Sequence, residues 1–499
     1  MAVQTVSTQV KELERSLGYA LLLGLVAALG QARIARAERA RAVALLVDVR
    51  QLTNSLLFDL HDAIEKLPGA TPARELVVRR ALQYVDRLAR EGSDDPALQL
   101  DLANAYGRLG RIQWDRYYAH LGDLAGGLLS QEKALALREA VLERDSTNTA
   151  VKRTVGFSHL SIGDALVGKG LLDAAVERYR QSLAIREALA SIPSAPLEDR
   201  KNLSVSYQRL GDAFGNPGMP NLGRTDQALE QYQKMQAIFE QLAAAPDATA
   251  DDRHSVGIGF EKLGRVHDGR GDHAGALEFY QKELAAFQAS VREAPENGQF
   301  RRDLAVGFGN VGDALTRLER YPEAFETYDQ ARAIRQRLAD ADPSNMGAVT
   351  DLALIRRALG FAHAGAANQT AAMGHFTAAA EGLNRALAAS PASGWVRRQL
   401  AGVLREMGTI AARTGHSADA FAFASRSLTV IREAADRPGA TPSDLNEFAW
   451  AALTIDVPAV RNPQVALGYA QRAVAATNEK DPLFLDTLVR AWFETGDIA

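Results

Sequence analysis

The sequence contains no cysteine, and this absence removes several kinds of chemistry at once. Without cysteine the chain has no disulfide bond, no thiolate metal site and no cysteine nucleophile. Aromatic residues make up only 7% of the 499 residues, which suits close packing of helices through small side chains. The formal net charge is −4. Because nucleic-acid binding needs concentrated basic residues, the composition gives no basis for a nucleic-acid partner.

The motifs of common catalytic sites are also absent. No Walker phosphate loop, nucleophile elbow or HExxH zinc motif occurs in the sequence. His254, His267 and His273 lack the i,i+4 spacing of two metal-binding histidines on one helix. We therefore predict a protein that is not an enzyme and that uses no cofactor or metal.

A single apolar run stands out near the N-terminus. No charged residue occurs between Arg15 and Arg33, and residues 17–29 are almost all apolar. The run has about the minimum length for a helix that crosses a hydrocarbon core of roughly 30 Å. We predict that it spans a membrane once, and a cleaved signal peptide or a buried first helix are the alternatives. The arginines after the run favour a cytoplasmic position for the rest of the chain.

A Leu-Gly pair, or a close equivalent, recurs along most of the chain. The repeat glycines are Gly110, Gly163, Gly211, Gly264, Gly312, Gly360 and Gly408, with spacings of 53, 48, 53, 48, 48 and 48 residues. An apolar residue stands eight positions before each glycine, and in most repeats an aromatic residue stands four before it. Small and aromatic residues follow at about twelve and sixteen positions, or five later in the first and third repeats. Such offsets predict an array of helical hairpins.

These offsets resemble those of the tetratricopeptide repeat, a helix-turn-helix unit of about 34 residues. The spacing here is longer, which indicates extra turns on each helix. The resemblance implies an all-α, right-handed superhelical solenoid of extended tetratricopeptide-like hairpins, and we expect a long N-terminal helix before it. We expect an N-terminal segment at 1–32, juxtamembrane helices at 33–95, seven repeats at 96–437 and divergent repeats at 438–499, the last incomplete.

A second resemblance concerns residues 31–74. This segment is similar to the region that follows the transmembrane helix in bacterial serine/threonine kinases with repeat tails. No kinase domain precedes it in this sequence, so no catalytic residue can be assigned from the family. In that family the repeats lie across the membrane from the kinase, which conflicts with the charge pattern, and the side of the membrane stays open. A cytoplasmic protein is the alternative.

In tetratricopeptide arrays the first helices line a concave groove that binds protein or peptide segments. The equivalent polar positions here are Arg111, Trp114, Asp115, Asp164, Gln208, Asp212, Asn216, Glu261, Arg265, Asp268, Asp313, Arg317, Arg357, Arg405 and Arg413. Acidic residues concentrate in the middle repeats and arginines in the last two. An ordinary solvated surface is the alternative, with Asp164, Asp212 and Asp313 capping or bridging helices.

We therefore predict a non-catalytic scaffold for protein-protein interaction, tethered to a membrane and related to signalling. The alternative is the regulatory portion of a bacterial serine/threonine kinase whose catalytic domain is missing or separately encoded. The sequence leaves the oligomeric state open.

Overall fold

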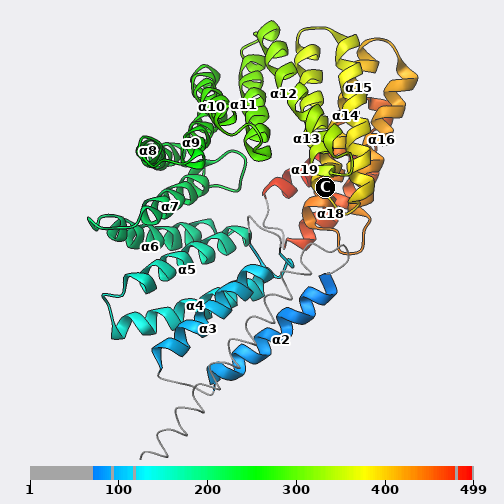
Figure 1. Cartoon of the computed structure of the whole chain (residues 1–499). Helices are drawn as coiled ribbons and strands as arrows, with labels where there is room; N and C mark the ends of the chain where they lie inside the picture. The colour runs from blue at the N-terminus through cyan, green and yellow to red at the C-terminus, as the bar shows by residue number, and fades with distance from the viewer. Residues whose placement is uncertain (1–70, 91–94, 116–119, 478–481, 497–499) are drawn as a thin grey trace, which may run out of the picture. The chain divides into compact units, whose positions relative to one another are not determined.

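The computed structural model describes residues 71–90, 95–115, 120–477 and 482–496, and all of their regular secondary structure is helical (Figure 1). The chain divides into two compact units, Met1–Ala195 and Pro196–Ala499, and each is described by itself. In the first unit the helices are α2 (Thr71–Arg90), α3 (Pro96–Gln113), α4 (Leu124–Arg144), α5 (Thr149–Gly168) and α6 (Leu172–Ala190).

The second unit begins with the long helices of the repeat array. They are α7 (Leu197–Gly215), α8 (Thr225–Ala243), α9 (Ala250–Gly269), α10 (His273–Glu293), α11 (Gly298–Arg317), α12 (Tyr321–Ala341), α13 (Met346–Gly365), α14 (Gln369–Ala389), α15 (Gly394–Arg413) and α16 (Ser417–Ala435). Shorter elements follow: α17 (Pro442–Thr454), the 3₁₀ turn η1 (Pro458–Val460), α18 (Pro463–Ala476) and α19 (Pro482–Thr495).

Helices that follow one another in sequence pack against one another in both units. From α3 to α16 they pair as hairpins, α3/α4 to α15/α16, in which the first helix carries the repeat glycine. This arrangement confirms the predicted all-α solenoid of tetratricopeptide-like hairpins. A single hairpin cannot bury both of its apolar faces, so each one is stabilised by its neighbours.

The repeat glycine permits the two helices of a hairpin to approach closely. A Cβ atom placed on Gly312 would lie 2.6 Å from Cε1 of Tyr328, whose ring is 1% exposed. The same contact joins Gly264 to Tyr280 and Gly360 to Phe376. A larger residue would push the aromatic ring out of its place, which explains why glycine and aromatic recur sixteen residues apart.

Side-chain caps and left-handed turns set the ends of several helices. Asn297 and Asn345 cap α11 and α13, and each side chain accepts hydrogen bonds from backbone N–H groups of the first turn. Gly271 adopts a φ of 79° between α9 and α10, a conformation that side chains of other residues disfavour. The connections that precede α10, α11 and α13 are therefore short and well defined.

The predicted single-pass membrane location is wrong on the evidence of the described helices. None of them is long and apolar enough to cross a bilayer. Residues 17–29, on which the prediction depended, lie outside the described residues, as does the long N-terminal helix expected before the repeats. Residues 31–70 of the kinase-like segment also lie outside them.

Candidate functional site

The first helices of the central hairpins form one side of the second unit. Helix α11 contacts both α9 and α13, although α10 and α12 lie between them in sequence. Helices on the inside of a curved array lie closest together, so we call the side formed by α9, α11, α13 and α15 the inner face. It contains most of the groove positions expected from the sequence.

Three of the expected groove residues connect the two helices of their own hairpin. The hydroxyl of Tyr232 donates to Asp212 at 2.6 Å, and that of Tyr328 donates to Asp313 at 2.6 Å. In the first unit, Tyr179 donates to Asp164 at 2.7 Å. In each pair the aspartate directly follows the repeat glycine. These carboxylates stabilise the hairpins, so we do not include them in a binding surface.

Asp212 is also the centre of a buried ion pair between two hairpins. Its Oδ1 atom accepts from Nζ of Lys262 at 3.0 Å and from Nδ2 of Asn216 at 2.7 Å. Burial favours the neutral acid, but the charge of Lys262 and hydrogen bonds from Tyr232, Asn216 and Lys262 outweigh it and lower the pKa of Asp212. The site is a closed contact between α7, α8 and α9.

A different buried carboxyl lies on α10. The side chain of Glu283 is fully buried, and Nδ2 of Asn310 on α11 donates to its two oxygens at 3.0 and 3.2 Å. Burial and the charge of Glu261 raise its pKa well above the usual value, against the opposing effects of Asn310 and Arg265. The equivalent positions, nineteen residues after the other unshifted glycines, are Ser182, Ala331, Ala379 and Ser427.

The charged residues of α9 and α11 on the inner face are largely paired with one another. Nη1 of Arg317 lies 3.0 Å from Asp268, whose other oxygen lies 2.8 Å from Nδ1 of His273. On α9, Arg265 pairs with Glu261 at 2.7 Å. The structure thus brings these four expected groove residues into local ion pairs.

The inner face differs at α13 and α15. Arg405 and Arg413 are exposed, and Nη2 of Arg405 lies 3.4 Å from the carboxylate of the adjacent Glu406. Arg357 lies 5.8 Å from the ring of Phe361, which is 39% exposed and packs edge-on against Phe376. Burial lowers the pKa of Arg357, and the nearby charge of Asp313 offsets part of this effect. Phe361 directly follows Gly360, a groove offset at which other repeats have aspartate, but the sequence analysis did not include it.

The remaining expected residues pack within their own units. In the first unit, Trp114 packs on Gly168 of α5, where an added Cβ would meet the indole ring at 2.6 Å, and Arg111 lies 5.5 Å from the ring of Phe157. Asp115 is half-buried. In the second unit, Gln208 is half-buried and Asn216 ends α7.

Each of the three histidines considered in the sequence contacts an aspartate. His254 is buried between the rings of Phe287 and Phe300, at centroid distances of 4.6 and 4.2 Å, and Nε2 lies 2.9 Å from Asp303. Within the described ranges no group of three or more acidic or histidine residues is arranged to hold a metal ion.

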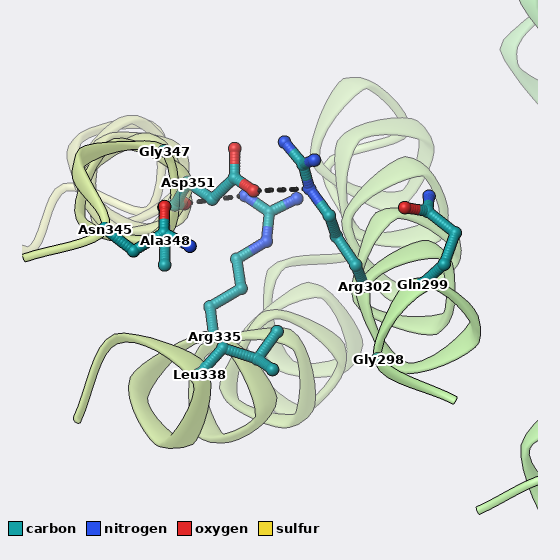
Figure 2. A pocket seen from close by; sticks show the side chains of 9 residues that line it. All are labelled: Gly298, Gln299, Arg302, Arg335, Leu338, Asn345, Gly347, Ala348 and Asp351. Carbon is teal, nitrogen blue, oxygen red and sulfur yellow. Dashed lines mark hydrogen bonds and ion pairs between the residues drawn. The ribbon is translucent and has the colours of Figure 1, made fainter. Parts of the chain in front are cut away.

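A small pocket of about 250 Å³ lies between α11, α12 and α13 (Figure 2). Figure 2 shows that Arg302 and Arg335 both reach Asp351. Nε of Arg302 lies 2.8 Å from the Asp351 carboxylate, and Nη1 of Arg335 donates to its backbone oxygen at 2.7 Å. Both arginines hold α13 in place, so this pocket is a packing contact between hairpins.

Comparisons with known proteins return structures but no family. No family model matches the chain, and no curated protein matches it. The apo form of RapI is 12% identical with a TM-score of 0.47, covering 90% of this chain and all of that one. A tetratricopeptide repeat protein from Parabacteroides merdae is also 12% identical, with a TM-score of 0.34, covering 67% of this chain and 98% of that one.

YrrB, a tetratricopeptide repeat protein with an unusual peptide-binding site, is 17% identical with a TM-score of 0.26, covering 53% of this chain and 95% of that one. These TM-scores lie below 0.5. The repeat architecture is therefore taken from the helices of this chain alone.

Proposed function

We propose that the protein is a non-catalytic scaffold that binds an extended protein segment on the inner face at α13 and α15. The observation that carries this proposal is the contrast within the inner face: charges on α9 and α11 form ion pairs with one another, whereas Phe361 on α13 and Arg405 and Arg413 on α15 are exposed. An aromatic side chain with neighbouring arginines is typical of a binding hot spot.

The chemistry of this surface defines the bound segment. Arginine forms strong, often bidentate, hydrogen bonds with carboxylates, so the segment carries acidic residues. Phe361 offers an apolar contact, which an aromatic or aliphatic side chain of the segment would cover. The similarity of residues 31–74 to a segment of bacterial serine/threonine kinases with repeat tails supports a role in signalling, and this role is part of the proposal.

The test begins with selection of peptides from a phage-displayed library on the full chain. We expect the selected peptides to combine acidic and aromatic residues and to lose at least about tenfold in affinity for the double variant Arg357→Glu/Arg405→Glu and for Phe361→Ala. Arg426→Glu is the matched control, because Arg426 is exposed on the second helix α16. Circular dichroism checks that the helices persist. Equal affinity of all variants would refute the inner-face site.

A further inference from the structure

A groove on another side of the second unit contains three arginines and no acidic residue. It has a volume of about 470 Å³ and lies between α10, α11 and α12. Its lining includes Arg292, Arg301, Arg337, Leu304, Phe308 and Ile334. We call it the α10–α12 groove. Its cations border an apolar floor, which is an unusual combination for a surface that only faces water.

The three arginines of the groove form no ion pair with any described residue, whereas the equivalents of Arg301 in two other hairpins do. The buried Nε of Arg301 also has no hydrogen-bond acceptor among the described residues. Nε of Arg337 donates a hydrogen bond of 3.3 Å to the backbone oxygen of Ala333, in its own helix. The positive charge of the groove is therefore not neutralised by this part of the chain.

The hairpin α15/α16 shows what the repeat does at the same positions. Arg397 stands eleven residues before Gly408, and it pairs at 2.6 Å with Glu433, twenty-five residues after that glycine. In α11/α12 the same offsets from Gly312 give Arg301 and Arg337. At the position of Glu433 this hairpin thus has Arg337. Two positive charges therefore stand where α15/α16 has an ion pair.

The hairpin α9/α10 gives an independent comparison. There Arg253 is also eleven residues before its glycine, and its Nε donates to Glu293 at 2.8 Å. The residue equivalent to Glu293 in α11/α12 is Ala341, which lines the groove. Both acids that neutralise this arginine in other hairpins are therefore missing in α11/α12.

The aromatic residue in the floor of the groove also lacks a charged neighbour that its equivalents have in other hairpins. Phe260, four residues before Gly264, has Nζ of Lys282 5.9 Å from its ring, and Tyr207 has Lys234 at 5.8 Å. Phe308 is the equivalent residue in α11/α12, but the position of these lysines is occupied by Gln330. No cation of its own second helix therefore covers Phe308 from that position, and the ring lines the groove.

We propose that the α10–α12 groove binds an acidic segment of a partner protein, whose carboxylates pair with Arg301 and Arg337 while an apolar side chain covers Phe308. Charge complementarity identifies the occupant, since the missing acids of this hairpin are carboxylates. The apolar floor and the hollow shape favour a protein segment over a nucleic-acid backbone or a lipid surface, which would need an exposed basic track. This binding surface is additional to the inner face.

The test uses the full chain and a fluorescently labelled peptide in which glutamates flank a leucine–phenylalanine pair. The key variant is Arg337→Glu, which restores the acid found at this position in α15/α16 and should keep the fold. We expect it to weaken peptide binding at least about tenfold, measured by fluorescence anisotropy. Arg385→Glu is the matched control, because Arg385 has the same offset in α13/α14 but Val349 replaces the neighbouring arginine.

Further measurements distinguish the possible ligands of the α10–α12 groove and distinguish this groove from the inner face. We expect binding to weaken with added salt and to be lost with a peptide in which glutamine replaces glutamate. Because the inner face is proposed to bind similar peptides, Arg337→Glu is also compared in the Arg357→Glu/Arg405→Glu background. The loss that Arg337→Glu causes there reports the α10–α12 groove alone, so failure of the inner-face site would not imply failure here. Equal binding by Arg337→Glu would overturn the proposal. The proposal would also be overturned if the unmodified chain did not bind the peptide. The same holds if Arg337-dependent binding occurred only with a single-stranded oligonucleotide or with phosphatidylserine vesicles.

Discussion

Two neighbouring groups of helices in the second unit each bury a carboxyl group, but the pKa of that group is lowered in one and raised in the other. Between α7 and α9, Asp212 accepts from Lys262 and its pKa is lowered. Between α10 and α11, Glu283 accepts hydrogen bonds from the neutral amide of Asn310, and its pKa is raised well above the usual value. Both groups are buried. Burial alone therefore does not determine the pKa of a carboxyl group, because the charges and hydrogen bonds of neighbouring side chains also contribute.

The largest expected effect comes from removing the cation of the first group of helices. Lys262→Met leaves the charge of Asp212 buried without its partner, and we expect a loss of about 3–5 kcal/mol in the free energy of unfolding. Denaturant unfolding followed by circular dichroism measures it. Lys234→Met is the control: Lys234 pairs with Glu230 but is 48% exposed, so a change of only a few tenths of a kcal/mol is expected. Similar losses in both variants would show that Lys262 is no more important than a surface lysine.

A second prediction concerns Glu283 and pH. A carboxyl with a raised pKa in the folded chain binds its proton more tightly there than when unfolded, so its contribution to stability is present at low pH. That contribution is lost as the pH rises from the unfolded value near 4.5 through the raised folded pKa. Glu283→Gln removes this titration and keeps an acceptor for Asn310. We expect it to raise the free energy of unfolding by about 1–3 kcal/mol at pH 8 relative to the unmodified chain.

The control for this pH profile lies in the other group of helices. The lowered pKa of Asp212 stabilises the fold above its unfolded value of 3.8, and this contribution is lost as the pH falls through the lower folded pKa. Asp212→Asn should therefore change the acidic side of the profile. Unfolding curves of both variants between pH 3 and pH 9 separate the two groups. If Glu283→Gln changed only the acidic side, the raised pKa of Glu283 would be incorrect.

The sequence predicts the hairpins because their closest contact recurs at a constant offset. Gly312 and Tyr328 are sixteen residues apart and touch within one hairpin, so the pattern is visible without knowledge of neighbours. The charge state of Glu283 depends instead on residues from α9, α10 and α11, and no single offset reveals that combination. The reversal from Glu433 to Arg337 could have been found in the sequence, by comparing the second helices as closely as the first.

The smallest predicted effect tests whether neighbouring charge, as well as burial, acts on Glu283. Glu261 raises the pKa of Glu283 and also occupies Arg265 through their 2.7 Å pair. Glu261→Gln removes one negative charge and leaves Arg265 available to Glu283, so the folded pKa of Glu283 should fall toward its usual value. The decline in the free energy of unfolding with rising pH should then end at a lower pH. We expect the free energy of unfolding at pH 8 to rise by only a few tenths of a kcal/mol, because Glu261 is partly exposed and its own pair with Arg265 is lost.

The measurement is the same unfolding series, and the double variant Glu261→Gln/Glu283→Gln supplies the control. If burial alone sets the pKa of Glu283, Glu261→Gln will change stability equally with and without Glu283. A smaller effect in the Glu283→Gln background would show that the two carboxyl groups are coupled.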